Sequence, residues 1–178
     1  MKFIPTEISG VWIVDLERHE DERGSFARTW CAAEFAKHGL NPRLAQCSAS
    51  FNKKKGTLRG MHYQAVPHEE AKLVRCTRGA IFDVALDLRA NLPTFKRWVG
   101  VELSAGNGRA LYIPEGCAHG FQTLEDNTEV FYQMTEPFHP EAVRGVRWND
   151  PQFGVQWPIF DPIISDRDRN LPLFTAEL

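Results

Sequence analysis

The sequence lacks the long apolar segment that a membrane-spanning helix requires. No hydrophobic run in its 178 residues approaches the roughly 20 residues that cross a bilayer. The first residues, 1–7, also lack the apolar core of a signal peptide. We therefore expect a cytoplasmic protein with no membrane partner.

An excess of positive charge and metal-type cysteine pairs are absent as well. With 21 basic and 23 acidic residues the net charge is −2, which argues against a nucleic-acid-binding protein. No Cys-x-x-Cys pair occurs, so a zinc knuckle is not expected. In a reducing cytosol we expect free thiols at all four cysteines, Cys31, Cys47, Cys76 and Cys117.

Regular helices are scarce, and short β-strands separated by Gly, Pro and Asn turns dominate the pattern. The best early helix candidate is 31–40, which Gly39 would end. Many short strands without intervening helices predict an all-β antiparallel sandwich or barrel. We expect one domain over residues 1–178, with a barrel at about 44–135. N-terminal strands and a tail of turns and short helices after residue 140 should pack on that barrel. Strands are expected near 11–14, 25–30, 44–52, 57–64, 71–77, 80–87, 96–103, 109–113, 118–124 and 129–135.

Two segments with glycine or proline corners each end in a histidine. Residues 56–64 read Gly-Thr-Leu-Arg-Gly-Met-His-Tyr-Gln, and residues 108–120 read Gly-Arg-Ala-Leu-Tyr-Ile-Pro-Glu-Gly-Cys-Ala-His-Gly. The pair resembles the two signature motifs of the cupin superfamily, which implies a double-stranded β-helix, or jelly roll. Metal-binding cupins carry His-x-His in the first motif, whereas this chain has His62 and then Gln64. With one imidazole missing, we expect no metal and no cofactor, and His62 becomes a candidate for proton transfer.

Regular strand geometry would place Arg59 and His62 of the first motif on opposite faces of the sheet. In a regular strand His62 faces the same way as Gly60, whereas Arg59 faces the opposite way. If Arg59 and His62 serve one pocket, the strand must be bulged or kinked, and glycine is the residue that tolerates this. The sequence therefore predicts an irregularity at Gly60 and Met61.

Six blocks of the chain together resemble the dTDP-4-dehydrorhamnose 3,5-epimerase family, the nucleotide-sugar epimerase branch of the cupins. The resemblance implies a metal-free homodimer that inverts C3 and C5, or C3 only, of a dTDP-4-keto-6-deoxy-hexose. It also implies a role in dTDP-L-rhamnose or related deoxysugar biosynthesis, for surface polysaccharide or for glycosylated metabolites. The matching blocks are 21–26, 58–64, 71–79, 82–89, 114–121 and 147–151.

Epimerisation beside a ketone requires a base near neutrality, a donor at the enolate oxygen, and an acid on the opposite face. Imidazole titrates near neutrality, so His62 suits the base. The resemblance assigns the other catalytic roles. Asp168 would fix the tautomer of His62, with Asp166 in reserve; Lys72 would meet the developing negative charge; and Tyr132 would deliver the proton to the far face.

The resemblance also implies a substrate-binding set that includes Lys72. Polar groups of the substrate, including the diphosphate, would contact Arg23, Arg59 and His119, with Gln46 assisting. The nucleobase would stack on Phe26 and Phe138.

Departures from the family pattern at three places leave the nucleotide and the keto-sugar open. Arg28 stands where the family usually has Glu, Cys47 and Ser48 where it has Asp-Asn, and Val143 where it has Glu. These departures belong to the substrate contacts and not to the proton-transfer set.

Alternative functions remain open at this point. A sugar 3,4-ketoisomerase uses similar enolate chemistry without a metal, and a non-catalytic cupin would only bind a sugar. A metal-dependent cupin oxygenase would have to use the only plausible ligand set, His62, Gln64, Glu69 and His119. Single residues also have structural interpretations, since a tyrosine on a strand usually packs its ring and Asp168 lies in a charged tail.

Overall fold

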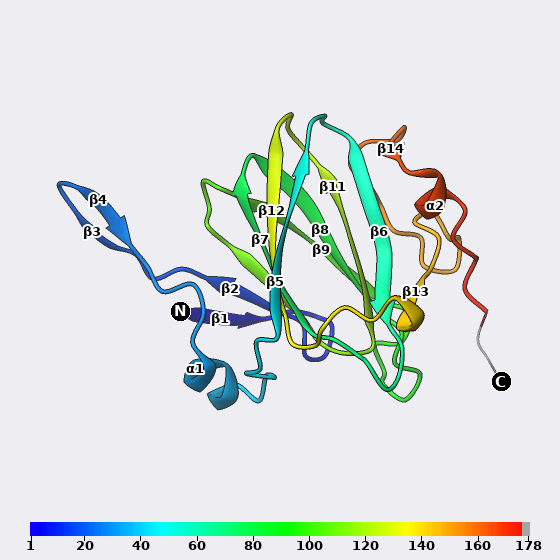
Figure 1. Ribbon diagram of the computed structural model, residues 1–178, viewed down its shortest axis with the longest axis horizontal. Helices are drawn as coiled ribbons and strands as arrows, with labels where there is room; N and C mark the ends of the chain where they lie inside the picture. The colour runs from blue at the N-terminus through cyan, green and yellow to red at the C-terminus, as the bar shows by residue number, and fades with distance from the viewer. Residues whose placement is uncertain (176–178) are drawn as a thin grey trace.

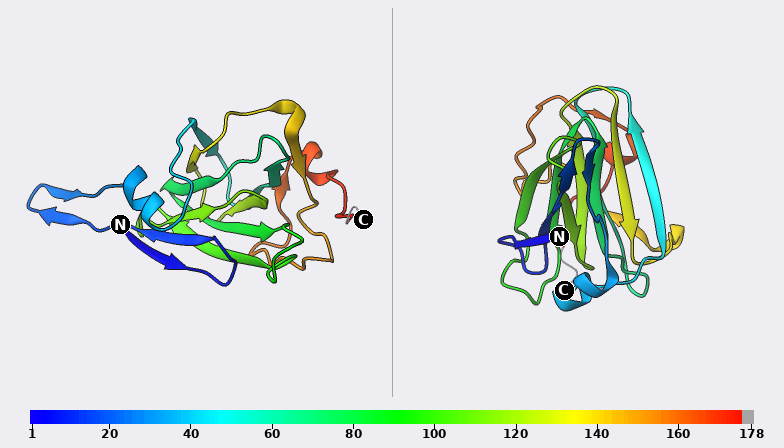
Figure 2. Two further views of the ribbon diagram at one scale, coloured as in Figure 1. Left: turned by 90° about the horizontal axis from the view of Figure 1, so that it is seen from below. Right: turned by 90° about the vertical axis from the view of Figure 1, so that its left-hand side faces the viewer.

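Two six-stranded β-sheets, connected mainly by loops and turns, form a jelly roll (Figures 1 and 2). The computed structural model describes residues 1–175. The all-β prediction is therefore confirmed, and the described residues include only short helices.

The first sheet has the strand order β1-β2-β10-β7-β12-β5, and the second has β13-β6-β11-β8-β9, with β14 parallel to β6. Each strand predicted between 44 and 135 is present, with ends shifted by two residues at most. The first sheet contains β1 (Lys2–Pro5), β2 (Trp12–Asp15), β5 (Gln46–Asn52), β7 (Lys72–Arg78), β10 (Ala110–Ile113) and β12 (Thr128–Met134). The second contains β6 (Thr57–Gln64), β8 (Ala80–Asp87), β9 (Trp98–Ser104), β11 (Cys117–Thr123), β13 (Val143–Gly145) and β14 (Ile163–Ile164).

The N-terminal region differs from the prediction in one important respect. The expected strand over 25–30 ends at Phe26, because it pairs only within the hairpin of β3 (His19–Asp21) and β4 (Gly24–Phe26). This hairpin, which we call the arm, projects away from both sheets (Figure 1). The arm therefore holds its residues outside the body of the chain.

The helices are short and peripheral. The helix α1 (Ala32–Lys37) lies within the predicted range 31–40, and Gly39 follows it with a φ of +69°. The 3-10 helix η1 (Pro140–Ala142) and the helix α2 (Asp166–Arg169) belong to the tail, where short helices were predicted. Within residues 1–175 no helix is long and apolar enough to span a membrane.

The apolar core lies between the two sheets. Val74 and Leu111 of the first sheet and Ile81, Leu103 and Phe121 of the second are almost fully buried in one cluster. Burial of aliphatic and aromatic side chains of this size contributes about 1.5–3 kcal/mol each. The core therefore fixes the two sheets against each other and makes a rigid frame for the polar side chains beside it.

The predicted irregularity of β6 is confirmed. Pairing with β11 runs from His62 opposite His119 to Arg59 opposite Phe121, so the register shifts by one residue across Gly60. Gly60 has a φ of +129°, and a Cβ there would lie 2.5 Å from the Cα of Gly120. Only glycine fits this position. As a result, Arg59 and His62 line the same cavity.

Candidate active site

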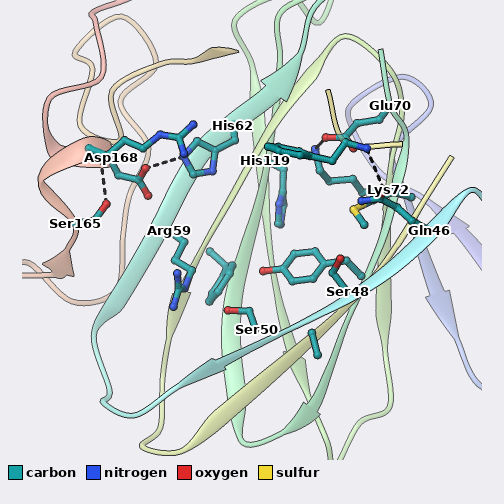
Figure 3. A pocket seen from close by; sticks show the side chains of 16 residues that line it. Gln46, Ser48, Ser50, Arg59, His62, Glu70, Lys72, His119, Ser165 and Asp168 are labelled. Atoms are coloured by element: carbon teal, nitrogen blue, oxygen red, sulfur yellow. Dashed lines mark hydrogen bonds and ion pairs between the residues drawn. The ribbon is translucent and has the colours of Figure 1, made fainter. Parts of the chain in front are cut away.

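A cavity of about 440 Å³ opens between the two sheets and is closed on one side by the C-terminal segment (Figure 3). It is lined by residues of both sheets and of that segment, and it brings together most of the predicted site. The predicted residues that line it are Gln46, Arg59, His62, Lys72, His119, Tyr132, Phe138 and Asp168.

His62 and Asp168 form a hydrogen-bonded pair at one wall (Figure 3). The Nε2 of His62 lies 2.8 Å from Oδ1 of Asp168, and 35% of the His62 side chain is exposed. Because a carboxylate only accepts hydrogen bonds, it fixes the proton of the neutral imidazole on Nε2. The lone pair then lies on Nδ1, the nitrogen that a proton-accepting base needs.

Local structure holds Asp168 in place. Ser165 caps α2 by accepting a hydrogen bond from the backbone N–H of Asp168. The backbone N–H of Gly60 donates to Oδ2 of Asp168 at 3.1 Å, so the kink in β6 also orients the carboxylate. Burial alone would raise the pKa of Asp168, but hydrogen bonds from His62 and Gly60 and the charge of Arg167 outweigh it and lower this pKa. Asp168 is therefore an anion at neutral pH.

Asp166, the reserve candidate for the same role, is placed elsewhere. Its side chain is exposed and does not line the cavity, and its backbone carbonyl accepts from the side chain of Asn170. Asp168, not Asp166, is the carboxylate that the structure brings to His62.

His119 on β11 lines the same cavity and pairs with Asp83 on β8, which lies behind the lining. The Nε2 of His119 lies 2.7 Å from Oδ1 of Asp83, and Asp83 is fully buried. Oδ2 of Asp83 has no hydrogen-bond partner within the described part of the chain. His119 sits directly opposite His62 in the β6–β11 pairing, so two imidazoles meet at one end of the cavity.

Tyr132 approaches from the first sheet, on β12. Its ring stands edge-on to the ring of His119, with centroids 6.1 Å apart. Burial, followed by the charge of Asp83, raises the pKa of the Tyr132 hydroxyl well above its usual value. The hydroxyl is therefore protonated at neutral pH and can donate a proton.

Lys72 lies on β7, in the same sheet as Tyr132. Its Nζ is 2.5 Å from Oε1 of Glu70, and both side chains are almost buried. The pair lines the cavity, so the ammonium charge predicted for the enolate is held by a carboxylate (Figure 3).

The mouth of the cavity carries the predicted binding residues. Gln46 accepts a hydrogen bond at 2.9 Å from the backbone N–H of Phe138, whose ring is 58% exposed. Arg59 donates to Asn52 at 2.8 Å. Arg167 lines the same space and adds a second guanidinium. The mouth therefore offers cations and one exposed aromatic face, which suit a diphosphate and a nucleobase.

Arg23 and Phe26 do not line this cavity. Both lie on the arm, where the side chain of Arg23 is 85% exposed and Phe26 is 74% exposed. Arg23 makes its ion pair with the neighbouring Asp21, at 2.6 Å. Within one chain, these two predicted binding residues are separated from the other predicted site residues.

The three departures from the family pattern fall in different places. Ser48 lines the cavity, where it can affect the choice of substrate. Arg28 is exposed and pairs with Glu34 at 3.0 Å. Val143 pairs with Gln64 across β13 and β6 and lies outside the cavity lining.

The ligand set considered for a metal-dependent cupin is not assembled. The side-chain amide of Gln64 is occupied, because its Nε2 donates to the carbonyls of His68 and Pro137 and its Oε1 accepts from the N–H of His139. Glu69 is exposed and does not line the cavity. His62 and His119 instead bond to separate carboxylates.

Three charged residues of the site were missed by the sequence interpretation: Glu70 and Arg167, which line the cavity, and the buried Asp83, which pairs with His119 behind the lining. Only Asp83 carried a clear signal, since it is a lone charge within the apolar run 81–86. A buried charge requires a partner, so that run should have pointed to a paired carboxylate. Glu70 stood in a polar turn and Arg167 in a charged tail, where exposed residues are common.

The comparisons with known proteins agree with this geometry. Residues 5–176 match the family described as dTDP-4-dehydrorhamnose 3,5-epimerase. The chain belongs to this family. The enzyme of that name from Methanothermobacter thermautotrophicus is 46% identical over 95% of this chain and 92% of its own length.

Solved structures of the family have the same fold. The epimerase from Elizabethkingia anophelis has a TM-score of 0.95 at 37% identity and covers 98% of this chain and 96% of its own. The Legionella pneumophila enzyme, in complex with dTDP-4-keto-L-rhamnose, has a TM-score of 0.90 at 37% identity and covers 97% and 92%. The chain is thus an epimerase of the isomerase class that acts on a nucleotide sugar, with the jelly-roll fold that the resemblance implied.

Proposed function

We propose that the protein inverts C3 and C5 of a dTDP-4-keto-6-deoxy-hexose through an enolate intermediate, in dTDP-L-rhamnose biosynthesis. The observation that carries the proposal is the pairing of His62 with Asp168 on one sheet's side of a cavity that Tyr132 enters from the other sheet. The complex of the Legionella relative with dTDP-4-keto-L-rhamnose supports the identity of the sugar and of the nucleotide.

His62 is the base. Its Nδ1 accepts the proton from the carbon beside the ketone, and the anionic Asp168 stabilises the imidazolium that results. Because 35% of the His62 side chain is exposed, the accepted proton exchanges with water. The electron pair left on carbon moves onto the C4 oxygen as an enolate.

The enolate oxygen needs hydrogen-bond donors. Lys72 and His119 enter the cavity from opposite sheets. Lys72 donates through its ammonium group. Because Nε2 of His119 already donates to Asp83, His119 donates to the enolate through Nδ1 as the protonated ring, a form that the Asp83 carboxylate stabilises, and both hydrogen bonds strengthen as negative charge develops. Glu70 and Asp83 orient these two donors through their ion pairs. Such donors act more strongly in a partly desolvated cavity than in water.

Tyr132 is the acid. Its hydroxyl is protonated and faces the cavity from the sheet opposite His62, so it returns a proton to the other face of the carbon. In the chair form of a gluco-configured sugar, H3 and H5 are axial on the same face. One base and one acid on opposite faces therefore serve both carbons in turn, and a single inversion results when only C3 reaches the base.

The diphosphate and the base of the nucleotide occupy the mouth of the cavity. Arg59 and Arg167 supply charge-assisted hydrogen bonds to phosphate oxygens, and Phe138 offers a face for stacking. Ser48 contributes to nucleotide choice.

The test is proton exchange in deuterated water. The protein is incubated with dTDP-4-keto-6-deoxy-glucose, and the sugar is followed by NMR beside His62→Ala. Deuterium at C3 and C5 that disappears in His62→Ala is the expected result, while deuterium at C3 alone would identify a 3-epimerase. Migration of the ketone to C3, or exchange that survives in His62→Ala, would contradict the proposal.

We also propose that the active unit is a homodimer in which each arm completes the partner's cavity. Arg23 and Phe26 are predicted to bind substrate, yet they are exposed on an arm that projects away from their own body (Figure 1). A second copy related by two-fold symmetry can receive the arm and return its own. Arg23 then reaches the diphosphate and Phe26 the nucleobase of the neighbouring site.

Complementation between two inactive variants tests whether the subunits exchange their arms. His62→Ala and Arg23→Ala are mixed under conditions that let chains exchange. If the arm acts on the partner, each mixed dimer contains one intact site, and about one quarter of all sites regain activity. Sedimentation of each protein gives the oligomeric state. A monomer, or a dimer that shows no complementation, would contradict the exchange.

We propose that the enzyme acts in the cytoplasm. The free thiols of its cysteines, two of them buried, support a reducing compartment. Cell fractionation with an antibody against the protein tests this, and recovery in an oxidising compartment would contradict it.

A further inference from the structure

Three side chains outside the cavity form a cluster that the proposed reaction does not use. His68, Glu136 and His139 place one ligand atom each within 4.8 Å of one another. Oε1 of Glu136 lies 3.8 Å from Nδ1 of His68 and 3.7 Å from Nε2 of His139. In a tetrahedral zinc site, bonds of about 2.0–2.2 Å separate neighbouring ligand atoms by about 3.3–3.6 Å. The two distances from Glu136 therefore need to shorten by at most about 0.5 Å, and the distance between the two imidazole nitrogens, which lies within 4.8 Å, by at most about 1.5 Å.

The backbone of both histidines is already fixed by one buried side chain. Gln64 donates to the carbonyl of His68 at 2.9 Å and accepts from the N–H of His139 at 2.7 Å. Gln64 is 2% exposed. The two loops that carry the ligands are thus held together before any ion binds, which lowers the entropic cost of binding. Only the imidazole rings, which are stacked with centroids 3.6 Å apart, need to rotate.

Neighbouring groups orient two of the three ligands. Nδ1 of His139 lies 3.2 Å from Oε1 of Glu141, a carboxylate that fixes the ring proton on Nδ1 and leaves the lone pair on Nε2. Nε2 is the nitrogen that faces Glu136. Arg43 donates to Oε2 of Glu136 at 2.8 Å and so leaves Oε1 for an ion. This is the arrangement of outer partners that metal-binding imidazoles and carboxylates typically have.

We propose that His68, Glu136 and His139 bind a zinc ion at the mouth of the cavity, with water as the fourth ligand. Two imidazoles and one carboxylate match the ligand preference of zinc. The site is distinct from the proton-transfer groups. It lies next to them, because Phe138 is between two of the ligands in sequence and its N–H is held by Gln46 of the cavity. Zinc therefore clamps the segment that presents Phe138 and tightens substrate binding without changing the chemistry.

Zinc titration of an untagged, chelator-treated protein tests the site. Wild type is expected to bind one zinc ion per chain, and His139→Ala and Glu136→Gln, which each remove a ligand, should lower the affinity by more than about 100-fold. Glu141→Gln, which removes only the orienting carboxylate, should weaken binding by about tenfold. Two controls separate this cluster from other imidazoles: His62→Ala in the cavity and His19→Ala on the arm should both bind as wild type.

A second measurement does not depend on how the variants fold. Anomalous scattering at the zinc edge from crystals of the wild-type protein should place the ion between His68, Glu136 and His139. Zinc should also lower KM for the nucleotide sugar in wild type and not in His139→Ala, with kcat unchanged. Absence of bound zinc, a peak on His62 and His119 instead, or binding that persists in His139→Ala would overturn the proposal.

Discussion

Two histidines that line one cavity each pair with an aspartate, and the two pairs differ in their surroundings. His62 pairs with Asp168, whose other oxygen accepts from Gly60, and 35% of the His62 side chain is exposed. His119 pairs with Asp83, whose other oxygen has no partner in the described residues, and only 6% of the His119 side chain is exposed. The same two side-chain types are thus placed once at the edge of the cavity and once inside the protein.

This difference separates two chemical roles. A base must release its proton to water after each turnover, so it needs access to solvent, and His62 has it. A donor to an enolate must keep a fixed geometry, and the buried Asp83 carboxylate holds the protonated ring of His119 rigidly, with Nδ1–H free to donate. The comparison teaches that the environment of a pair, rather than its composition, decides whether a histidine moves protons or only donates a hydrogen bond.

The largest effect is expected when His62 is removed. His62→Ala should lower kcat by about 10³–10⁴-fold, because general base catalysis contributes this much or slightly less in typical enzymes. Steady-state rates on the dTDP keto-sugar measure it. A loss of kcat smaller than that in His119→Asn would contradict the assignment of His62 as the base and His119 as a hydrogen-bond donor.

Asp168→Asn should lower kcat by about 10³-fold, since an amide no longer fixes the tautomer of His62 or stabilises its charged form. It also gives a stability test. The pKa of Asp168 is lower in the folded chain, so its stabilisation is complete above the unfolded pKa and is lost as the pH falls through the folded value. Chemical denaturation should show a wild-type advantage of about 1–3 kcal/mol at pH 7 that shrinks below about pH 4. A constant difference across this range would contradict the assignment.

His119→Asn should lower kcat by about 10²-fold, which is typical for loss of one donor to a developing oxyanion. The shape of the pH–rate profile should stay that of the wild type, since His62 still moves the proton. If His119→Asn instead abolished the fall in rate at low pH that protonation of the base causes, His119, and not His62, would be the base.

The smallest effect on activity is expected at Glu70. Glu70→Gln keeps the shape of the side chain and removes the charge beside Lys72, so it should change kcat/KM by only about two- to fivefold. Because it leaves the almost buried ammonium of Lys72 without a charged partner, it should lower the free energy of unfolding by about 3–5 kcal/mol. Glu102→Gln, at an exposed position on β9 outside the cavity, is the matched control and should not change kcat/KM. An effect at Glu70 as large as that of Asp168→Asn would contradict the view that Glu70 only orients Lys72.

Much of the fold could be predicted from the sequence because strand alternation and turn residues are local signals. The strands between 44 and 135 and the irregularity at Gly60 were found in this way. The arm was not, because alternation over 25–30 cannot show whether a strand joins a sheet or only its own hairpin. Pairing partners are a property of the tertiary structure.

The site was predictable only in part for the same reason. The contact between His62 and Asp168 joins residues 106 positions apart, and only the family resemblance suggested it. Asp83 and Glu70 belong to the site because they pair with His119 and Lys72, and no local sequence pattern reveals these pairings. The cluster of His68, Glu136 and His139 likewise depends on two loops that Gln64 brings together.

The central claim is that His62 removes the proton from one face and Tyr132 returns it to the other. It is tested most directly by following Tyr132→Phe in deuterated water. This variant keeps the base and lacks the acid, so it should exchange the hydrogens at C3 and C5 for deuterium while the sugar keeps its configuration. Loss of exchange and inversion in parallel, or inversion at the wild-type rate, would contradict the claim.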